Sequence, residues 1–102
     1  MARFVKVAKT GEIGPGEARM VEVEGKKIAL FNVEGRFFGI DDTCTHRSGP
    51  LSEGEVAGEE VTCPWHGAIF NLRTGKAIGP PAPTGVNVYR VRVKATDIEV
   101  EL

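Results

Sequence analysis

All of the cysteines and histidines of this chain lie within one short window of the sequence. Cys44 and His46 form a C-x-H pair, and after sixteen residues Cys63 and His66 form a C-x-x-H pair. Thiolate and imidazole are both good ligands for transition metals. The chain must therefore fold so that two separate segments meet, each contributing one sulfur and one nitrogen ligand to a single metal site.

Length and composition place few other constraints on the chain. Its 102 residues predict a single domain over 1–102, and 41% hydrophobic with 26% charged residues is ordinary for a globular protein. A net charge of −1 gives no reason to expect a nucleic-acid partner. No apolar run approaches the roughly 18 residues of a membrane span, and no signal peptide is visible. We therefore expect a cytoplasmic protein without membrane contact and, with both cysteines in the metal window, without disulfides.

The hydrophobic pattern predicts an all-β fold. Segment 97–102 alternates cleanly between apolar and polar residues, whereas 27–33 holds a continuous apolar run that indicates a strand buried on both faces. Thirteen glycines, six prolines and the absence of a long helical period argue against helices. The predicted strands are 20–24, 27–33, 36–40, 68–72, 86–93 and 97–102, with 86–93 pairing with 97–102.

Both ligand pairs fall on predicted loops between these strands. One pair follows the strand that ends near residue 40, and the other precedes the strand at 68–72. We read 47–60 as a loop because it is rich in glycine and proline, and 79–83 as a stiff proline loop. The sequence therefore predicts a small metal-binding subdomain of two loops, at about 41–78.

The order of the ligands narrows the choice of metal. Sites with sulfur and nitrogen ligands indicate zinc or iron–sulfur chemistry. Structural zinc sites usually pair ligands of the same type, whereas here each loop mixes a thiolate with an imidazole. Cys44 and His46 are close together for two ligands of one small ion, but their spacing suits one ligand on each of two neighbouring irons.

The two segments closely resemble the cluster-binding motifs of the Rieske [2Fe–2S] family. The matching stretches are CTHRSGPL, from Cys44, and CPWHGAIF, from Cys63. In this family two histidines replace two cysteines on one of the two irons. The resemblance covers the whole chain and implies an antiparallel β-sandwich carrying one [2Fe–2S] cluster. It also implies that Cys44 and Cys63 hold the inner iron, that His46 and His66 hold the outer iron, and that Pro80 and Pro81 cover the cluster.

The resemblance also implies a low redox potential. Rieske proteins of respiratory cytochrome bc complexes carry a serine and a tyrosine after the second histidine, and a disulfide between the two motifs. Here the corresponding positions hold Ala68 and Phe70, and the cysteine positions are Gly49, or a near neighbour, and Trp65. Without those hydroxyl donors the reduced cluster is less stabilised. We expect a potential near the bottom of the Rieske range of about −150 to +300 mV.

Among Rieske proteins, a small chain without a disulfide resembles the ferredoxins of bacterial ring-hydroxylating oxygenases. This resemblance implies a monomeric one-electron carrier, not an enzyme, that passes electrons from a flavoprotein reductase to a terminal oxygenase. Docking would occur at the tip formed by His46, His66 and Trp65. Two alternatives remain: a small subunit of a larger oxidoreductase such as assimilatory nitrite reductase, and a zinc-stabilised interaction module.

Residues beside the motifs have two possible roles. Trp65, Arg47 and Leu51 could pack in the core or lie at the surface and contact a partner, and for Trp65 we favour the surface. Between the motifs, four glutamates could form a solvated loop, which we favour, or an acidic docking face. These are Glu53, Glu55, Glu59 and Glu60.

Overall fold

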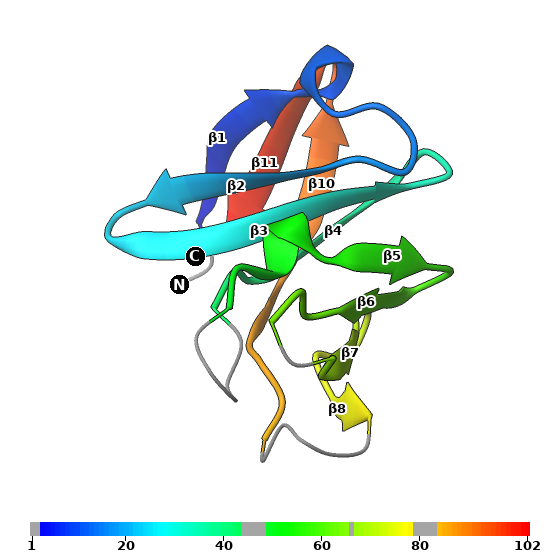
Figure 1. Ribbon diagram of the computed structural model, residues 1–102. Helices are drawn as coiled ribbons and strands as arrows, with labels where there is room; N and C mark the ends of the chain where they lie inside the picture. The colour runs from blue at the N-terminus through cyan, green and yellow to red at the C-terminus, as the bar shows by residue number, and fades with distance from the viewer. Residues whose placement is uncertain (1–2, 44–48, 66, 79–83) are drawn as a thin grey trace.

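The computed structural model describes residues 3–43, 49–65, 67–78 and 84–102. Within these ranges the chain forms antiparallel strands and two short 3-10 helices, η1 (Thr10–Glu12) and η2 (Leu51–Glu53) (Figure 1). The strands form three sheets. The first has the order β1 (Phe4–Lys9), β11 (Asp97–Glu101), β10 (Val91–Lys94); the second β2 (Ala18–Val23), β3 (Lys26–Val33), β4 (Arg36–Asp41), β9 (Val88–Tyr89); the third β5 (Glu55–Ala57), β6 (Glu60–Thr62), β7 (Ile69–Asn71), β8 (Ala77–Ile78). The all-β prediction is confirmed.

Two-residue turns set the register of the central sheet. Glu24 and Gly25 connect β2 to β3, and Glu34 and Gly35 connect β3 to β4, with all four residues at positive φ. Turns of this kind match the right-handed twist of the paired strands, which is why they favour glycine at the second position. The glycine-containing turns expected from the sequence are therefore present at both ends of β3.

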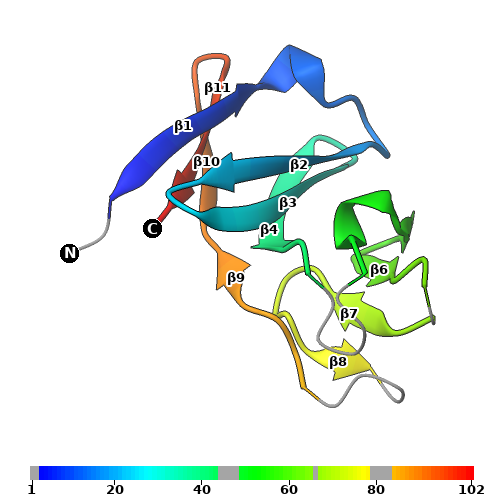
Figure 2. The ribbon, with the colours of Figure 1, turned by 60° about the vertical axis from the view of Figure 1, so that its left-hand side comes forward.

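Strand β3 is buried on both faces because it lies between two cores. Ile28 and Leu30 pack in the core shared with the first sheet, whereas Ala29 and Phe31 pack in the core shared with the third sheet. All four side chains have zero exposure. Since side chains alternate along a strand, a continuous apolar run is the expected pattern for a strand covered on both sides. Figure 2 shows β3 and β4 between the other two sheets.

The third sheet carries the region of the predicted metal site. Its core contacts come from short strands and from η2, which pack against the open face of the central sheet. The buried side chains of this core are Ala29, Phe31, Ile40, Leu51, Val61, Cys63, Ala68, Phe70 and Leu72. An apolar interface therefore fixes the third sheet to the central sheet, in addition to the chain segments that connect the two sheets.

Two details of the sequence-based fold are wrong. Segment 47–60 is not a loop throughout, because it contains η2, β5 and the first residue of β6. Segment 86–93 is not one strand, because β9 pairs with β4 whereas β10 pairs with β11. Strands of two or three residues are too short to show a period, and the change of sheet depends on long-range pairing, which local alternation does not encode.

Within the described ranges, no helix combines the length and apolar character that crossing a bilayer requires.

Candidate metal centre

Of the four predicted ligands, the structure places Cys63. Cys44, His46 and His66 lie outside the described residues, as do Arg47 and the proline loop at 79–83. The residues on either side of the gaps are described, however. They show how the ends of both motifs are held.

Cys63 lies at the start of a tight hairpin. Its backbone N–H donates to the carbonyl of Ala68 (2.7 Å), and its carbonyl accepts from the N–H of Gly67 (3.1 Å). These bonds extend the pairing of β6 with β7 to the position of the ligand. Gly67 adopts φ +77°, a conformation that glycine takes at little cost, so the glycine serves the turn. Cys63 itself is 2% exposed, so its sulfur faces the protein interior.

The first motif approaches the second at Gly49. A Cβ atom at Gly49 would lie 2.7 Å from Sγ of Cys63 and 3.1 Å from Cγ of Trp65. The backbone of the first motif therefore touches the sulfur of the second, which is the convergence that a shared metal centre requires. The donor set read from the sequence and this close approach both fit a cluster held between two loops, and only the structure shows the close approach.

Asp42 closes the first loop at its base. Its carbonyl accepts from the N–H of Leu51 (2.6 Å), and its side-chain oxygen Oδ1 accepts from the N–H of Ser52 (2.8 Å), next to a bridge between Thr43 and Pro50. Asp42 is 6% exposed, and these bonds give its buried carbonyl and Oδ1 hydrogen-bond partners. Leu51 has zero exposure, so it is a core residue and not a docking residue.

Ala68 and Phe70, the positions after the second motif, are fully buried. Neither side chain has a hydrogen-bond donor to offer to a cluster. This agrees with the premise of the low-potential prediction, while the potential itself stays a prediction.

Adding a hydroxyl at either position should raise the midpoint potential. We expect Ala68→Ser and Phe70→Tyr each to move it upward within the range of about −150 to +300 mV, because donors near the cluster stabilise the reduced state. Protein-film voltammetry measures the shift. Phe70→Leu is the control, since it alters packing without adding a donor. Unchanged potentials in both hydroxyl variants would contradict this account.

Trp65 projects from the same hairpin into solvent. It is 56% exposed, so the surface position expected from the sequence is confirmed. In the same hairpin, Thr62, Cys63, Pro64 and Gly67 line a groove together with Glu53 and Glu55. The immediate neighbourhood of the second motif therefore offers an exposed aromatic ring and two carboxylates.

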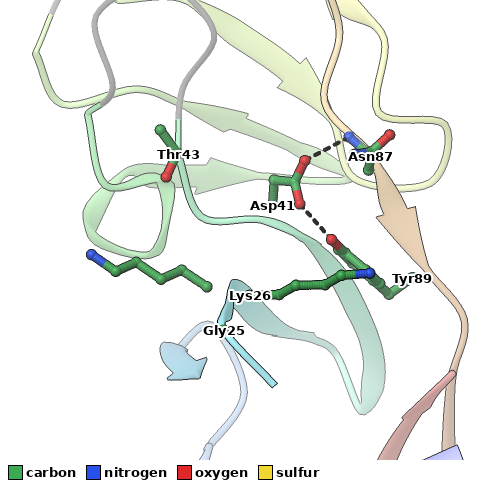
Figure 3. A pocket seen from close by; sticks show the side chains of 7 residues that line it. Gly25, Lys26, Asp41, Thr43, Asn87 and Tyr89 are labelled. Atoms are coloured by element: carbon green, nitrogen blue, oxygen red, sulfur yellow. Dashed lines mark hydrogen bonds between the residues drawn. The ribbon is translucent and has the colours of Figure 1, made fainter. Parts of the chain in front are cut away.

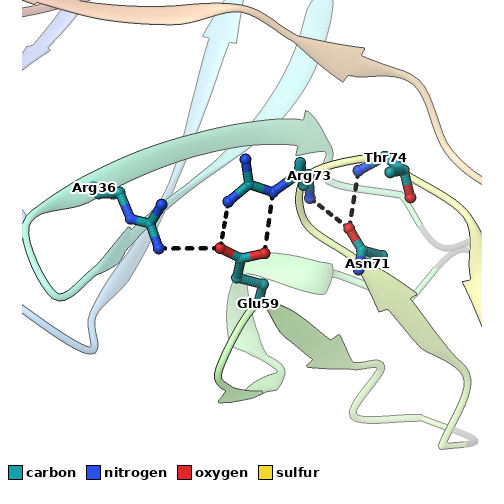
Figure 4. A network of polar contacts seen from close by, with 5 residues as sticks. All are labelled: Arg36, Glu59, Asn71, Arg73 and Thr74. Atoms are coloured by element: carbon teal, nitrogen blue, oxygen red, sulfur yellow. Dashed lines mark hydrogen bonds and ion pairs between the residues drawn. The ribbon is translucent and has the colours of Figure 1, made fainter.

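Glu59 does not belong to that acidic surface. It accepts two hydrogen bonds from Arg73 (2.6 and 3.1 Å) and one from Arg36 (3.2 Å), which ties the third sheet to the start of β4 (Figure 4). Hydrogen bonding from Arg73, aided by the positive charges of both arginines, holds the pKa of Glu59 below its usual range despite desolvation. Asn71 supports the pair by accepting from the backbone N–H groups of Arg73 and Thr74. The four glutamates therefore do not lie on one solvated loop, because Glu55 is on β5, Glu60 is on β6 and Glu59 is held by two arginines.

Sequence reasoning also missed Asp41, the last residue of β4. Its carboxylate accepts hydrogen bonds from the hydroxyl of Tyr89 (2.6 Å) and from the backbone N–H of Asn87 (3.1 Å) (Figure 3). These three residues line an open pocket together with Lys26, Lys27 and Thr43. Burial, followed by the bond to Asp41, raises the pKa of Tyr89 to about 12. No local motif marks this pair, because its members are 48 positions apart.

Deprotonation of Tyr89 should make the folded protein less stable at high pH. Its pKa is 10.0 ordinarily and about 12 in the folded chain, so the stabilisation is complete below pH 10 and is lost as pH rises through 12. We expect the free energy of unfolding to fall by about 1 kcal/mol across this interval, after allowing for solvent screening. Urea unfolding at a series of pH values, compared with Tyr89→Phe, isolates the effect because the chain has one tyrosine. Parallel pH dependences in the two proteins would exclude it.

Comparison with known proteins identifies the family. The sequence profile of the Rieske [2Fe–2S] domain matches residues 3–90. The chain belongs to the Rieske [2Fe–2S] domain family. The predicted cofactor, a [2Fe–2S] cluster, is thereby confirmed, and the matches give no support to the zinc-module alternative.

Several Rieske proteins match this chain along nearly their whole length. The biphenyl dioxygenase ferredoxin subunit of Pseudomonas sp. (strain KKS102) is 40% identical over 99 residues, which are 96% of this chain and 91% of that protein. The ferredoxin of carbazole 1,9a-dioxygenase from Nocardioides aromaticivorans IC177 has a TM-score of 0.90 at 29% identity, with 95% of each chain covered. A structure described as a complex of reduced oxygenase and oxidised ferredoxin in carbazole 1,9a-dioxygenase contains a chain with a TM-score of 0.88 at 35% identity, covering 95% of this chain and 91% of that one.

Two further matches concern a catalytic subunit and a nitrite reductase small subunit. In the terminal oxygenase of carbazole 1,9a-dioxygenase from Nocardioides aromaticivorans IC177 the match covers 29% of that chain, at 29% identity and a TM-score of 0.86. A putative NADH-dependent nitrite reductase small subunit from Mycobacterium tuberculosis has a TM-score of 0.91 at 22% identity, over 100% of this chain and 96% of that one, which shows a shared fold alone. The proteins matched end to end with substantial identity are ferredoxin components, so the prediction of an electron carrier and not a catalytic subunit is confirmed.

Proposed function

We propose that this Rieske protein carries single electrons from a flavoprotein reductase to the terminal oxygenase of a ring-hydroxylating system. The observation that carries the proposal is the 40% identity, over nearly the whole length of both chains, to a biphenyl dioxygenase ferredoxin subunit. The nature of the site agrees with this role, because an exposed tryptophan lies two residues from a buried cysteine ligand.

In this proposal the ligands are Cys44 and Cys63 on one iron and His46 and His66 on the other, within a subdomain at about 41–78. When bound, the cluster supplies a redox centre that accepts and donates one electron at a time. The chain buries Cys63 in the core and keeps its backbone bonded within the hairpin. A ligand held in this way needs little rearrangement between the two oxidation states.

The docking surface in this proposal is the tip formed by His46, His66 and Trp65. Exposed aromatic residues are frequent anchors in protein interfaces. Glu53 and Glu55 line a groove with Cys63 and Pro64 and would favour a partner that presents lysine or arginine side chains. We place the protein in the cytoplasm as a monomer that contacts each partner transiently.

Reconstitution with a purified flavoprotein reductase and terminal oxygenase tests this function. We expect reduction of the cluster on addition of NADH and reductase, followed by hydroxylation of the aromatic substrate, with the cluster-free variant Cys63→Ser as a negative control. Trp65→Ala should slow electron transfer to the oxygenase, and added salt should slow it further if carboxylates steer the encounter. Failure of an intact cluster to accept or deliver electrons with any such pair would contradict the proposal.

The assembly state separates this function from that of a fixed subunit. A carrier purifies alone and is reduced by a separable flavoprotein. A nitrite reductase small subunit would instead co-purify with its large subunit in a constant ratio. Size-exclusion chromatography of the natively expressed protein distinguishes the two.

A further inference from the structure

Residues 84–87 connect the two halves of the metal site although they contain none of the proposed ligands. This segment leads into β9 and lies between two anchor points. On one side, the N–H of Val86 donates to the carbonyl of Gly75 (2.8 Å), in the turn that follows β7. On the other side, the N–H of Asp41 donates to the carbonyl of Asn87 (3.0 Å), and Asp41 Oδ2 accepts from the N–H of Asn87 (3.1 Å).

The first anchor is a direct contact between two backbones. A Cβ at Gly85 would lie under 3.0 Å from the carbonyl oxygen of Gly75, and a Cβ at Gly75 would lie equally close to the carbonyl oxygen of Val86. Backbone atoms cannot move aside as the end of a flexible side chain can. This junction therefore requires glycine at both positions, and it fixes 84–87 to the sheet that carries Cys63.

The second anchor fixes the same segment to the first motif. Asp41 is three residues before the ligand position Cys44, and Thr43 is the last residue described before it. Both carboxylate oxygens of Asp41 are used, one by Asn87 and the other by the hydroxyl of Tyr89 (Figure 3). The strand end that leads into the first motif is thus bonded to residues on both sides of Val88.

We propose that residues 84–87 act as a strut that sets the distance between the two cluster-binding segments, with Gly75 and Asp41 as its end points. The strut rests on the proposed ligand set, since it positions the segments that bear Cys44 and Cys63. Its residues are positioning residues that act through the backbones they hold. A correctly spaced pair of segments keeps all four ligands on the cluster, and a displaced strut loosens the ligands of one segment.

Gly85→Ala tests the first anchor. Gly11→Ala is the matched control, because a Cβ there meets nothing within 4 Å, and neither glycine has a positive φ. We expect Gly85→Ala to broaden and shift the EPR signal of the dithionite-reduced cluster and to speed iron loss to a chelator roughly tenfold, as loss of an outer-shell partner does. Gly11→Ala should match the wild type in both measurements.

Asp41 variants test the second anchor without a steric clash. Asp41→Ala should change the EPR signal and the iron-release rate in the same direction as Gly85→Ala, whereas Asp41→Asn keeps an acceptor oxygen and should restore most of the wild-type behaviour. If Asp41→Ala and Gly85→Ala lower the midpoint of urea unfolding but leave the EPR signal and iron release of the folded protein unchanged, the proposal that residues 84–87 act as a strut is wrong. If the wild type itself shows no Rieske EPR signal, the ligand proposal fails instead.

Discussion

Replacing Cys63 with serine is expected to yield a folded chain that contains essentially no iron or acid-labile sulfide. The thiolate is the form that binds iron, and a serine hydroxyl at the same place is a far weaker ligand at neutral pH. Cys63 is 2% exposed, and the other members of its described core cluster are hydrophobic side chains that cannot take over as iron ligands. Iron and sulfide analysis, with the visible and EPR spectra, measures the result.

A control separates the loss of a ligand from damage to the core. Val61→Ala removes two methyl groups from a fully buried neighbour on β6 and should cost about 1–3 kcal/mol of stability while keeping the cluster. Wild-type iron and sulfide contents in Cys63→Ser would show that Cys63 is not a ligand. Stoichiometric zinc in the wild-type protein would support the zinc-module alternative.

Gly49→Ala is expected to lower cluster occupancy severely even though it adds a single methyl group. That group would lie 2.7 Å from Sγ of Cys63 and within 3.2 Å of two atoms of the Trp65 ring. The sulfur is only two bonds from Cα, and the backbone of Cys63 is held by the hairpin, so removing the clash requires one of the two motifs to move. We expect about 1–3 kcal/mol of destabilisation, the usual cost of overpacking, concentrated at the site.

The iron content of Gly49→Ala and the EPR line shape of the reduced protein test this expectation. Gly11→Ala again serves as the control for glycine replacement in open space. A broadened signal and a substoichiometric cluster are the expected results. A fully occupied cluster with a wild-type spectrum would mean that the two motifs separate without cost, and the close approach would then have no role in cluster binding.

Gly49 of the first motif lies against the ring of Trp65 of the second motif. A Cβ at Gly49 would lie 3.1 Å from the ring of Trp65. The resemblance to the Rieske proteins of cytochrome bc complexes places their extra cysteines at Trp65 and at Gly49 or a near neighbour, so this proximity agrees with the assignment of the two motifs. Glycine and tryptophan cannot form a disulfide, and we propose that backbone contacts such as those of residues 84–87 hold the motifs together.

The sequence could predict most of the fold and the type of site. The apolar run at Ile28–Phe31 predicted a strand covered on both faces, and the glycines at 25 and 35 predicted the turns around it. These signals are local, since side-chain alternation and turn conformation depend on neighbouring residues. Short strands such as Glu55–Ala57 escaped prediction because three residues contain too little of a period.

By itself, the sequence determined the type of chemistry: two cysteines and two histidines in an order that suits two unlike irons, with no hydroxyl at positions 68 and 70. Only the tertiary structure decided how the motifs are held, through Gly49 against Cys63, Glu59 between two arginines, and Asp41 bonded to Asn87 and Tyr89. Ligand identity is a property of single residues. The contacts that position them join residues 14 to 48 positions apart, and such pairings exist only once the sheets have packed together.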